Sequence, residues 1–251
     1  MKKSKFLALL LIPLSIGLFA CSDDDDDEDE PAQTTNNNSG GGGSSGSQSI
    51  MAPQFSDAQA TLIAIESVSN VMGIPISIGT AVAVFPDSSG ALLDVGAVTV
   101  EGENMPKQSN NSYVYTANQT SPQGISFSQP IDWNVAGSSS FQGFTKSQNQ
   151  AFPTVGDVSS AATVDKSDGY TLTVPTVSGA DSIMFLVGDV SMTLGGSATS
   201  YTFSSAELSA LANGQNIAQV AAYDIENSTQ NSKKVYFLTE TVKQLSVTIQ
   251  D

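Results

Sequence analysis

The chain has 251 residues and carries 25 acidic side chains against nine basic ones, with no histidine, so its formal net charge is −16. All nine basic residues are lysine, and a surface this acidic cannot neutralise phosphates, which excludes nucleic acid as a partner. The lack of histidine excludes a Ser-His-Asp triad, a Cys-His pair and an imidazole metal site. We therefore expect no catalytic residue, no metal ligand set and no cofactor.

The N-terminus combines lysines at positions 2, 3 and 5 with an apolar run over residues 6–20. Fifteen helical residues rise about 22 Å, whereas the hydrocarbon core of a bilayer is about 30 Å thick. The run is too short to span a membrane and is typical of a secretory signal peptide. We assign residues 1–20 to that signal.

The only cysteine, Cys21, follows directly after Leu18-Phe19-Ala20. The stretch LFAC resembles the lipobox of bacterial lipoproteins. The resemblance implies that Cys21 is acylated, palmitate included, and becomes the new N-terminus. A membrane would then be a partner of the chain through this lipid, because several acyl chains on one residue anchor stably.

Nine polar residues follow Cys21, and the last eight are consecutive carboxylates. They are Ser22, Asp23, Asp24, Asp25, Asp26, Asp27, Glu28, Asp29 and Glu30. The stretch resembles the acidic export signal that sends some lipoproteins of Gram-negative bacteria to the outer face of the outer membrane. The alternatives are a solvated spacer, since such a charge block cannot fold, and a lipoprotein that faces the periplasm.

Residues 31–49 are rich in glycine, serine and asparagine and lack any large apolar side chain. Such a composition cannot bury enough surface to offset the entropy of ordering. We expect residues 21–50 to form a disordered tether, with a mean span of about 30 Å for a random coil of this length.

The remaining body is predicted to be all-β, with two tandem β-sandwich domains over residues 51–153 and 154–251. Short segments rich in β-branched and aromatic residues alternate with turn residues. The predicted strands are 80–85, 95–100, 112–115, 131–135, 170–174, 183–187, 217–225, 235–238 and 245–250. The run 183–187 is apolar throughout, as in a fully buried central strand.

Two local patterns give sharper expectations. Ser204 and Glu207 form a capping box at the start of the only helical segment, which Gly214 ends. In the last strand, Leu245, Val247 and Ile249 should face the core, because side chains alternate between the two faces of a strand.

The second half of the body, from about Ala180 to Tyr223, resembles the Ig-like domains of large bacterial surface proteins. The first half, with GTAVAVFP, VGAVTVEG and WNVAGSSS, is similar to modules of uncharacterised lipoproteins. These resemblances imply a sandwich architecture and no defined activity.

A glycan-binding platform would require exposed aromatic side chains, for which Trp133, Tyr113 and Tyr115 are the candidates. The competing interpretation places Trp133 in the core, since its i±2 neighbours Ile131 and Val135 are aliphatic. Carboxylates at Glu101 and Glu103, or at Asp165 and Asp168, are explained by turns at the adjacent glycines.

The function predicted from the sequence is a lipid-anchored, surface-exposed and non-enzymatic binding or adhesion module whose ligand is a glycan or another surface protein. Two alternatives stay open. One is a structural or assembly component of the envelope that resembles a fimbrial anchor, although the chain lacks a basic residue between Ser22 and Met105 for the maturation cleavage of fimbrial subunits. The other is a glycan-binding accessory protein or a carboxylate-based glycosidase.

Overall fold

A computed structural model describes residues 55–71 and 74–251, in which β-strands joined by turns and loops predominate and a single short helix occurs. The predicted all-β class is confirmed, with sheets in a sandwich-like arrangement. The elements are β1 (Ala60–Val71), β2 (Ile74–Val84), β3 (Val98–Val100), β4 (Glu103–Asn104), β5 (Tyr113–Tyr115), β6 (Ile131–Gly137), β7 (Gln142–Gln148), β8 (Thr154–Val155), β9 (Thr163–Asp165), β10 (Tyr170–Thr173), β11 (Val177–Ser178), β12 (Ser182–Val187), β13 (Val190–Gly195), β14 (Ser200–Phe203), α1 (Ser205–Leu208), β15 (Gly214–Gln230) and β16 (Lys233–Gln250).

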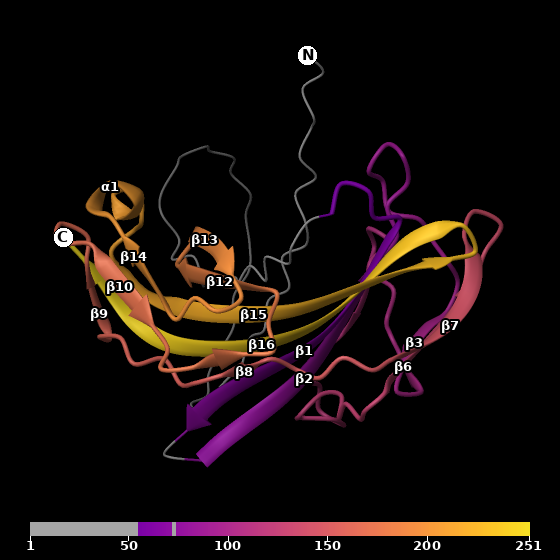
Figure 1. The fold of residues 1–251 in the computed structure, drawn as a ribbon, viewed down its shortest axis with the longest axis horizontal. Coiled ribbons are helices and arrows are strands. Elements are labelled where there is room, and N and C mark those ends of the chain that lie inside the picture. The colour runs from indigo at the N-terminus through magenta and orange to yellow at the C-terminus, as the bar shows by residue number, and fades with distance from the viewer. Residues whose placement is uncertain (1–54, 72–73) are drawn as a thin grey trace, which may run out of the picture. The chain divides into compact units, whose positions relative to one another are not determined.

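The main sheet has eight strands, seven of them in the order β13-β12-β15-β16-β1-β2-β5, with β9 beside the end of β16. Its two longest strands, β15 and β16, form a hairpin. They pair without a bulge from Gly214↔Ile249 to Gln230↔Lys233. Figure 1 shows this hairpin as a curved ribbon with β1 and β2 beside it. The parallel pairing of β1 with β16 joins a strand near the start of the body to the last strand of the chain.

The turn of this hairpin consists of Asn231 and Ser232, which both have positive φ, 48° and 66°. Two-residue hairpin loops favour this conformation because its twist matches that of the flanking strands. Asparagine is one of the residues that tolerate it best. The tight turn fixes the register of both strands.

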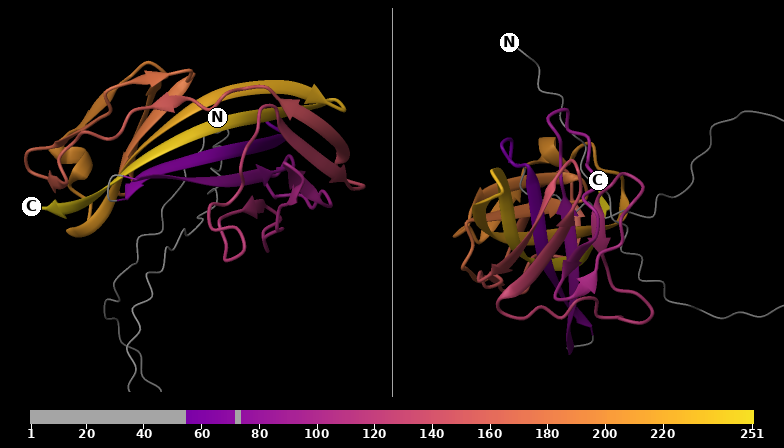
Figure 2. Two further views of the ribbon diagram at one scale, coloured as in Figure 1. Left: turned by 90° about the horizontal axis from the view of Figure 1, so that it is seen from below. Right: turned by 90° about the vertical axis from the view of Figure 1, so that its right-hand side faces the viewer.

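Two hydrophobic cores lie at opposite ends of the hairpin, and the left view of Figure 2 shows the smaller strands that cover the main sheet at each end. In the first core, the small sheet β4-β3-β6-β7 packs on β1, β2, β5 and the start of β16. In the second core, β10, β14 and α1 pack on β12, β15 and the end of β16. The main sheet is therefore shared by two separate packing layers.

Most predicted strands are present, but several boundaries differ, and strands β4, β7, β8, β9, β11, β13 and β14 were not predicted. Residues 235–238 and 245–250 were predicted as separate strands, and they belong to the single strand β16. Strand β1 was missed, because its buried residues fall on both parities and give no alternation. The run 183–187 is confirmed as a buried interior strand, between β13 and β15.

The capping box and the orientation of the last strand are confirmed, but the predicted helix stop is wrong, because Gly214 begins β15. Ser204 accepts a hydrogen bond from the backbone of Glu207 and the Glu207 carboxylate accepts one from the Ser204 backbone, although the helix they start ends at Leu208. Val247 and Ile249 are 1% exposed and Leu245 packs against them in the second core, whereas Ser246 and Gln250 are exposed.

The predicted boundary between residues 153 and 154 separates the two cores but not the sheet. Val235 and Phe237 of β16 belong to the first core, while Val247 and Ile249 of the same strand belong to the second. Residues Pro53–Asp251 accordingly form one compact unit. Within the described residues, no helix has the length and apolar character needed to cross a membrane.

Candidate functional site

The main sheet has two faces with different roles. Residues paired across strands share a face, and so do residues two apart along a strand. Both cores lie on one face, which we call the core face; it includes Leu62, Phe237, Ala222 and Val247. The opposite side we call the second face.

The centre of the second face is apolar and belongs to neither core. Nine of its side chains are between 0% and 7% exposed. They are Ile63, Ile65, Val82, Val114, Met184, Leu186, Ala221, Leu238 and Val242. They come from six neighbouring strands, so the face is a continuous apolar surface of the sheet.

A row of hydrogen-bonding side chains crosses this apolar surface. Ser182, Tyr223 and Glu240 lie in register on β12, β15 and β16, and Ile65 continues the row on β1. Neighbouring strands are about 4.8 Å apart, so the row extends over about 10 Å. Tyr223 and Glu240 are both 0% exposed.

Burial determines the protonation states of Tyr223 and Glu240 in this row. It raises the pKa of Glu240 to about 8, an effect that the nearby Tyr223 hydroxyl only partly offsets. Burial and the Glu240 carboxyl together raise the pKa of Tyr223 well above its usual range. At neutral pH the row therefore presents an uncharged carboxylic acid and an uncharged phenol.

Several polar atoms of the second face have no hydrogen bond of standard geometry within the described part of the chain. They are the Ser182 hydroxyl, both carboxyl oxygens of Glu240 and the Gln219 Nε2. Gln219 is 2% exposed, and its Oε1 accepts a hydrogen bond from Gln244 at 3.1 Å. One further atom of this kind, the Thr241 hydroxyl, lies on the core face.

Titratable groups buried in apolar surroundings are features to consider as a candidate site. Ligand sites are mostly apolar and contain a few polar groups that orient the ligand. Buried polar groups almost always have a partner, so each exception calls for an explanation. We take the second face around Glu240 as the candidate site.

The residues predicted for membrane attachment and export, Cys21 and Ser22 to Glu30, lie outside the described residues. The same holds for the predicted signal peptide and for the whole of the predicted tether, residues 21–50.

Trp133, the first candidate for a glycan platform, lies in the first core and is 1% exposed. Its indole N–H donates a hydrogen bond to Gln148 at 2.9 Å. Strand β6 alternates as predicted, with Ile131, Trp133 and Val135 buried and with Asp132 exposed. The core interpretation of Trp133 is confirmed.

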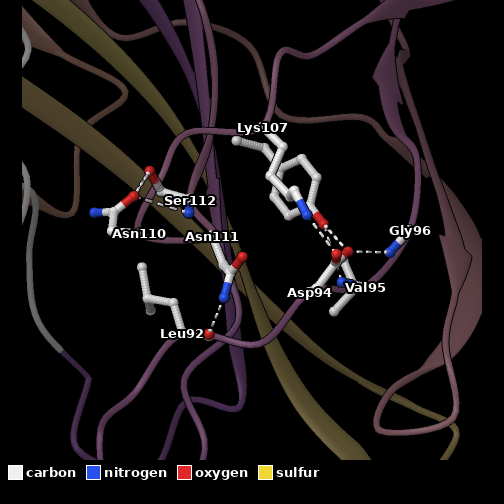
Figure 3. A network of polar contacts seen from close by, with 9 residues as sticks. Leu92, Asp94, Val95, Gly96, Lys107, Asn110, Asn111 and Ser112 are labelled. Atoms are coloured by element: carbon white, nitrogen blue, oxygen red, sulfur yellow. Dashed lines mark hydrogen bonds and ion pairs between the residues drawn. The ribbon is translucent and has the colours of Figure 1, made fainter.

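Tyr113 is also 1% exposed, and a polar network fixes its hydroxyl (Figure 3). The hydroxyl accepts from the Val95 backbone at 2.9 Å and donates to Asp94 at 3.1 Å. Asp94 also accepts from Gly96 and forms an ion pair with Lys107. The hydrogen bond from Lys107 is the main cause that lowers the pKa of Asp94 to about 2.

This network anchors the connection between β2 and β5, so Tyr113 has a structural role. Tyr115 is half-buried and packs against the first core. The three aromatic residues therefore do not form an exposed platform, because the rings of Trp133 and Tyr113 are buried.

The carboxylate pairs considered in the sequence lie at turns. Glu101 has a φ of 51° and precedes Gly102 at the turn between β3 and β4. Asp165 accepts hydrogen bonds from the backbone and hydroxyl of Ser167 at 2.9 and 2.7 Å. No group of three or more potential metal ligands occurs among the described residues.

Glu240 and Tyr223 were missed in the sequence. The reasoning that places Trp133 in the core also applies to Glu240, since its i±2 neighbours Leu238 and Val242 are aliphatic. Acidic side chains are rarely fully buried, and Glu240 stands between two threonines. For this reason no strand was predicted between residues 238 and 245.

Comparison with known proteins gave no match to a family model, to a curated protein or to a solved structure.

Proposed function

We propose that this protein is a lipid-anchored cell-surface binding module without enzymatic activity. The anchor is Cys21, the acidic run directs the chain to the outer face of a bacterial outer membrane, and residues 21–50 hold the β-sheet body away from the membrane. The finer description of the body as two Ig-like sandwiches belongs to the same proposal.

The observation that supports a binding role is the second face of the main sheet. Nine buried apolar side chains surround a row of uncharged polar groups, and none of the nine belongs to the two cores that the described residues form. A face that served only as packing surface would be more stable without Glu240, because burying a carboxyl costs free energy that the hydrogen bond with Tyr223 only partly offsets.

The anchoring is tested by metabolic labelling with an alkyne analogue of palmitate. We expect the wild-type chain to be labelled and the Cys21→Ala variant to be unlabelled. Added protease should degrade the wild-type protein on intact cells. An unlabelled wild-type chain would contradict the anchor, and complete protection from protease would contradict the surface location.

A second candidate, an assembly component of the envelope, is favoured by the edge of the main sheet. Strand β13 is the last strand on its side and pairs with β12 alone among the described strands. Open strand edges are templates for pairing with another chain. Concentration-dependent self-association that is lost in a Met192→Pro variant would favour this candidate.

A further inference from the structure

The chain enters the body through residues 55–59, which we call the entry segment, and these residues are held on the start of β16. The Gln59 N–H donates to the Lys234 carbonyl at 2.9 Å, and the Lys234 N–H donates to the Gln59 Oε1 at 2.8 Å. Asp57 accepts from the Lys234 ammonium at 2.6 Å and from the Tyr236 hydroxyl at 2.9 Å. Backbone and side-chain bonds thus fix the entry segment on two residues of β16.

These contacts contribute little to the packing of the body. The Phe55 ring stacks on Tyr236 with the centroids 3.8 Å apart, but no residue of the entry segment is fully buried or belongs to a core. Exposed ion pairs such as Asp57 with Lys234 add little to the free energy of folding. The position of the contacts is more informative, because a pull on the predicted tether reaches them before it reaches the sheet.

Strand β1 follows directly and lies in the interior of the main sheet, between β16 and β2 (Figure 1). It pairs in parallel with β16 from Ala60↔Val235 to Val68↔Lys243 and also pairs along its length with β2. The side chains of residues 62–65 are at most 2% exposed. An edge strand could be peeled away from one neighbour, whereas removal of β1 breaks two ladders and exposes buried side chains on both faces.

The two ends of the body load β1 and β16 in opposite directions. The tether joins the N-terminal end of β1, and Asp251 follows the C-terminal end of β16. Because the two strands are parallel, a pull between these ends slides one strand along the other. The hydrogen bonds of a parallel ladder run between the strands at even spacing, so sliding loads all of them together. A pull across the strands would instead open the pairs one at a time.

Strand β16 also connects the two cores along one continuous backbone. Its first half contributes Val235 and Phe237 to the first core, and its second half contributes Val247 and Ile249 to the second core. A force on the second core therefore passes along the covalent backbone of β16 to the pairs with β1. The parallel pair lies between the tether and the far end of the body.

We propose that the entry segment and the parallel pair of β1 and β16 form a load-bearing clamp, which keeps the body folded while the tether is pulled. The inference rests on the proposed function, because a load arises only when the chain is anchored at one end and bound to a partner at the other. Forced unfolding is governed by the unfolding barrier rather than by equilibrium stability. The clamp can therefore resist force in a body of ordinary stability.

The clamp is tested with optical tweezers on the full chain made by cell-free synthesis, in which Cys21 is not acylated. Cys21 is the only cysteine, so its thiol takes one DNA handle at the end of the tether. The second handle is attached either to a cysteine added after Asp251 or to a Ser232→Cys variant in the hairpin turn. The first geometry slides β1 along β16, and the second pulls their first pairs apart.

We expect the chain with the C-terminal handle to unfold at a force at least about twofold higher than the Ser232→Cys chain at the same pulling rate, because its ladder is loaded as a whole. Both chains contain the same sheet, and equal melting temperatures establish that they are equally stable. Equal unfolding forces in the two geometries, or a lower force with the C-terminal handle, overturn the clamp.

Two exposed ion pairs test the entry segment separately. Asp57→Ala removes the pair with Lys234, and the matched control Asp157→Ala removes a pair of 2.7 Å with Lys243 outside the entry segment. With the C-terminal handle, we expect Asp57→Ala to lower the unfolding force and Asp157→Ala to unfold as the wild type does. Both variants should keep the melting temperature within about 2 °C. An unchanged unfolding force in Asp57→Ala overturns the role of the entry segment.

The unfolding forces and the tests of the proposed function are independent. The tweezers replace the lipid with a DNA handle, so the force in each geometry does not depend on acylation or on surface location. Equal forces together with palmitate labelling and protease degradation would overturn the clamp and leave the anchored surface module intact. A higher force along the strands in a chain that is not labelled would overturn the anchor instead.

Discussion

The core face and the second face of the main sheet are built from the same strands, yet they bury different chemistry. On the core face, aliphatic and aromatic side chains from several packing layers fill two cores. On the second face, an equally buried aliphatic surface contains an uncharged acid, a phenol and an amide. The comparison indicates that burial alone does not make the two faces chemically alike, because the second face buries titratable groups that the two cores do not need for packing.

The largest loss of stability is expected from a charged side chain placed on the core face. Val247→Asp introduces a carboxylate at a position that is 1% exposed in the second core. Burying a carboxyl in place of a packed valine costs several kcal/mol, a large part of the roughly 5–15 kcal/mol by which domains are stable. Because β16 takes part in both cores, we expect the whole unit Pro53–Asp251 to unfold together.

Trp133 is the only tryptophan and lies in the first core, so its fluorescence reports the half of the unit that does not contain the mutation. We expect the Val247→Asp variant to show the emission of a solvent-exposed indole. A native emission spectrum with a separate thermal transition would show that residues 51–153 fold as an independent domain.

A loss of stability of intermediate size is expected when the pH rises. The Glu240 carboxyl keeps its proton up to about pH 8 in the folded chain, whereas a glutamate in an unfolded chain releases it near pH 4.3. Unfolding between these values releases a proton, so stability falls as the pH rises, by at most about 1.4 kcal/mol per pH unit, and levels off above pH 8.

Glu240→Gln removes this contribution, and the comparison with the wild type isolates it. Glu66 and Asp224 also have a raised pKa, chiefly through burial, and both variants retain them. Urea midpoints measured at pH 5, 6.5 and 8 should decline more steeply in the wild type than in Glu240→Gln. Parallel declines would mean that the Glu240 side chain is not buried in an apolar environment.

The sequence predicted the core face better than the second face. Alternation on β6 and at the end of β16 placed Trp133, Val247 and Ile249 correctly, because one parity was apolar and the other polar. Strand β1 and the middle of β16 are buried on both faces and lack this contrast. Their pairing depends on contacts between residues about 175 positions apart, such as Ala60↔Val235, which a local pattern does not reveal.

The smallest effect on stability is expected from the acidic run. Replacing Asp23 to Glu30 with serine and glycine should leave the melting temperature within about 2 °C, since a charge block makes no packed contacts. Protease accessibility on intact cells should decrease, because the export signal is lost. Unchanged protease accessibility would mean that the acidic run acts only as a spacer.

The packing of the two faces is tested most directly by two adjacent alanines on β15. Ala221 lies on the second face and Ala222 in the second core, and both are 0% exposed. The measurement is the melting temperature of Ala221→Phe and of Ala222→Phe in the same chain. Overpacking a core costs about 1–3 kcal/mol, or about 3–10 °C for a unit of this size. Because both side chains are fully buried, we expect both variants to lower the melting temperature by that amount. An unchanged melting temperature in Ala221→Phe would show that the second face has room for a large side chain and would contradict its burial.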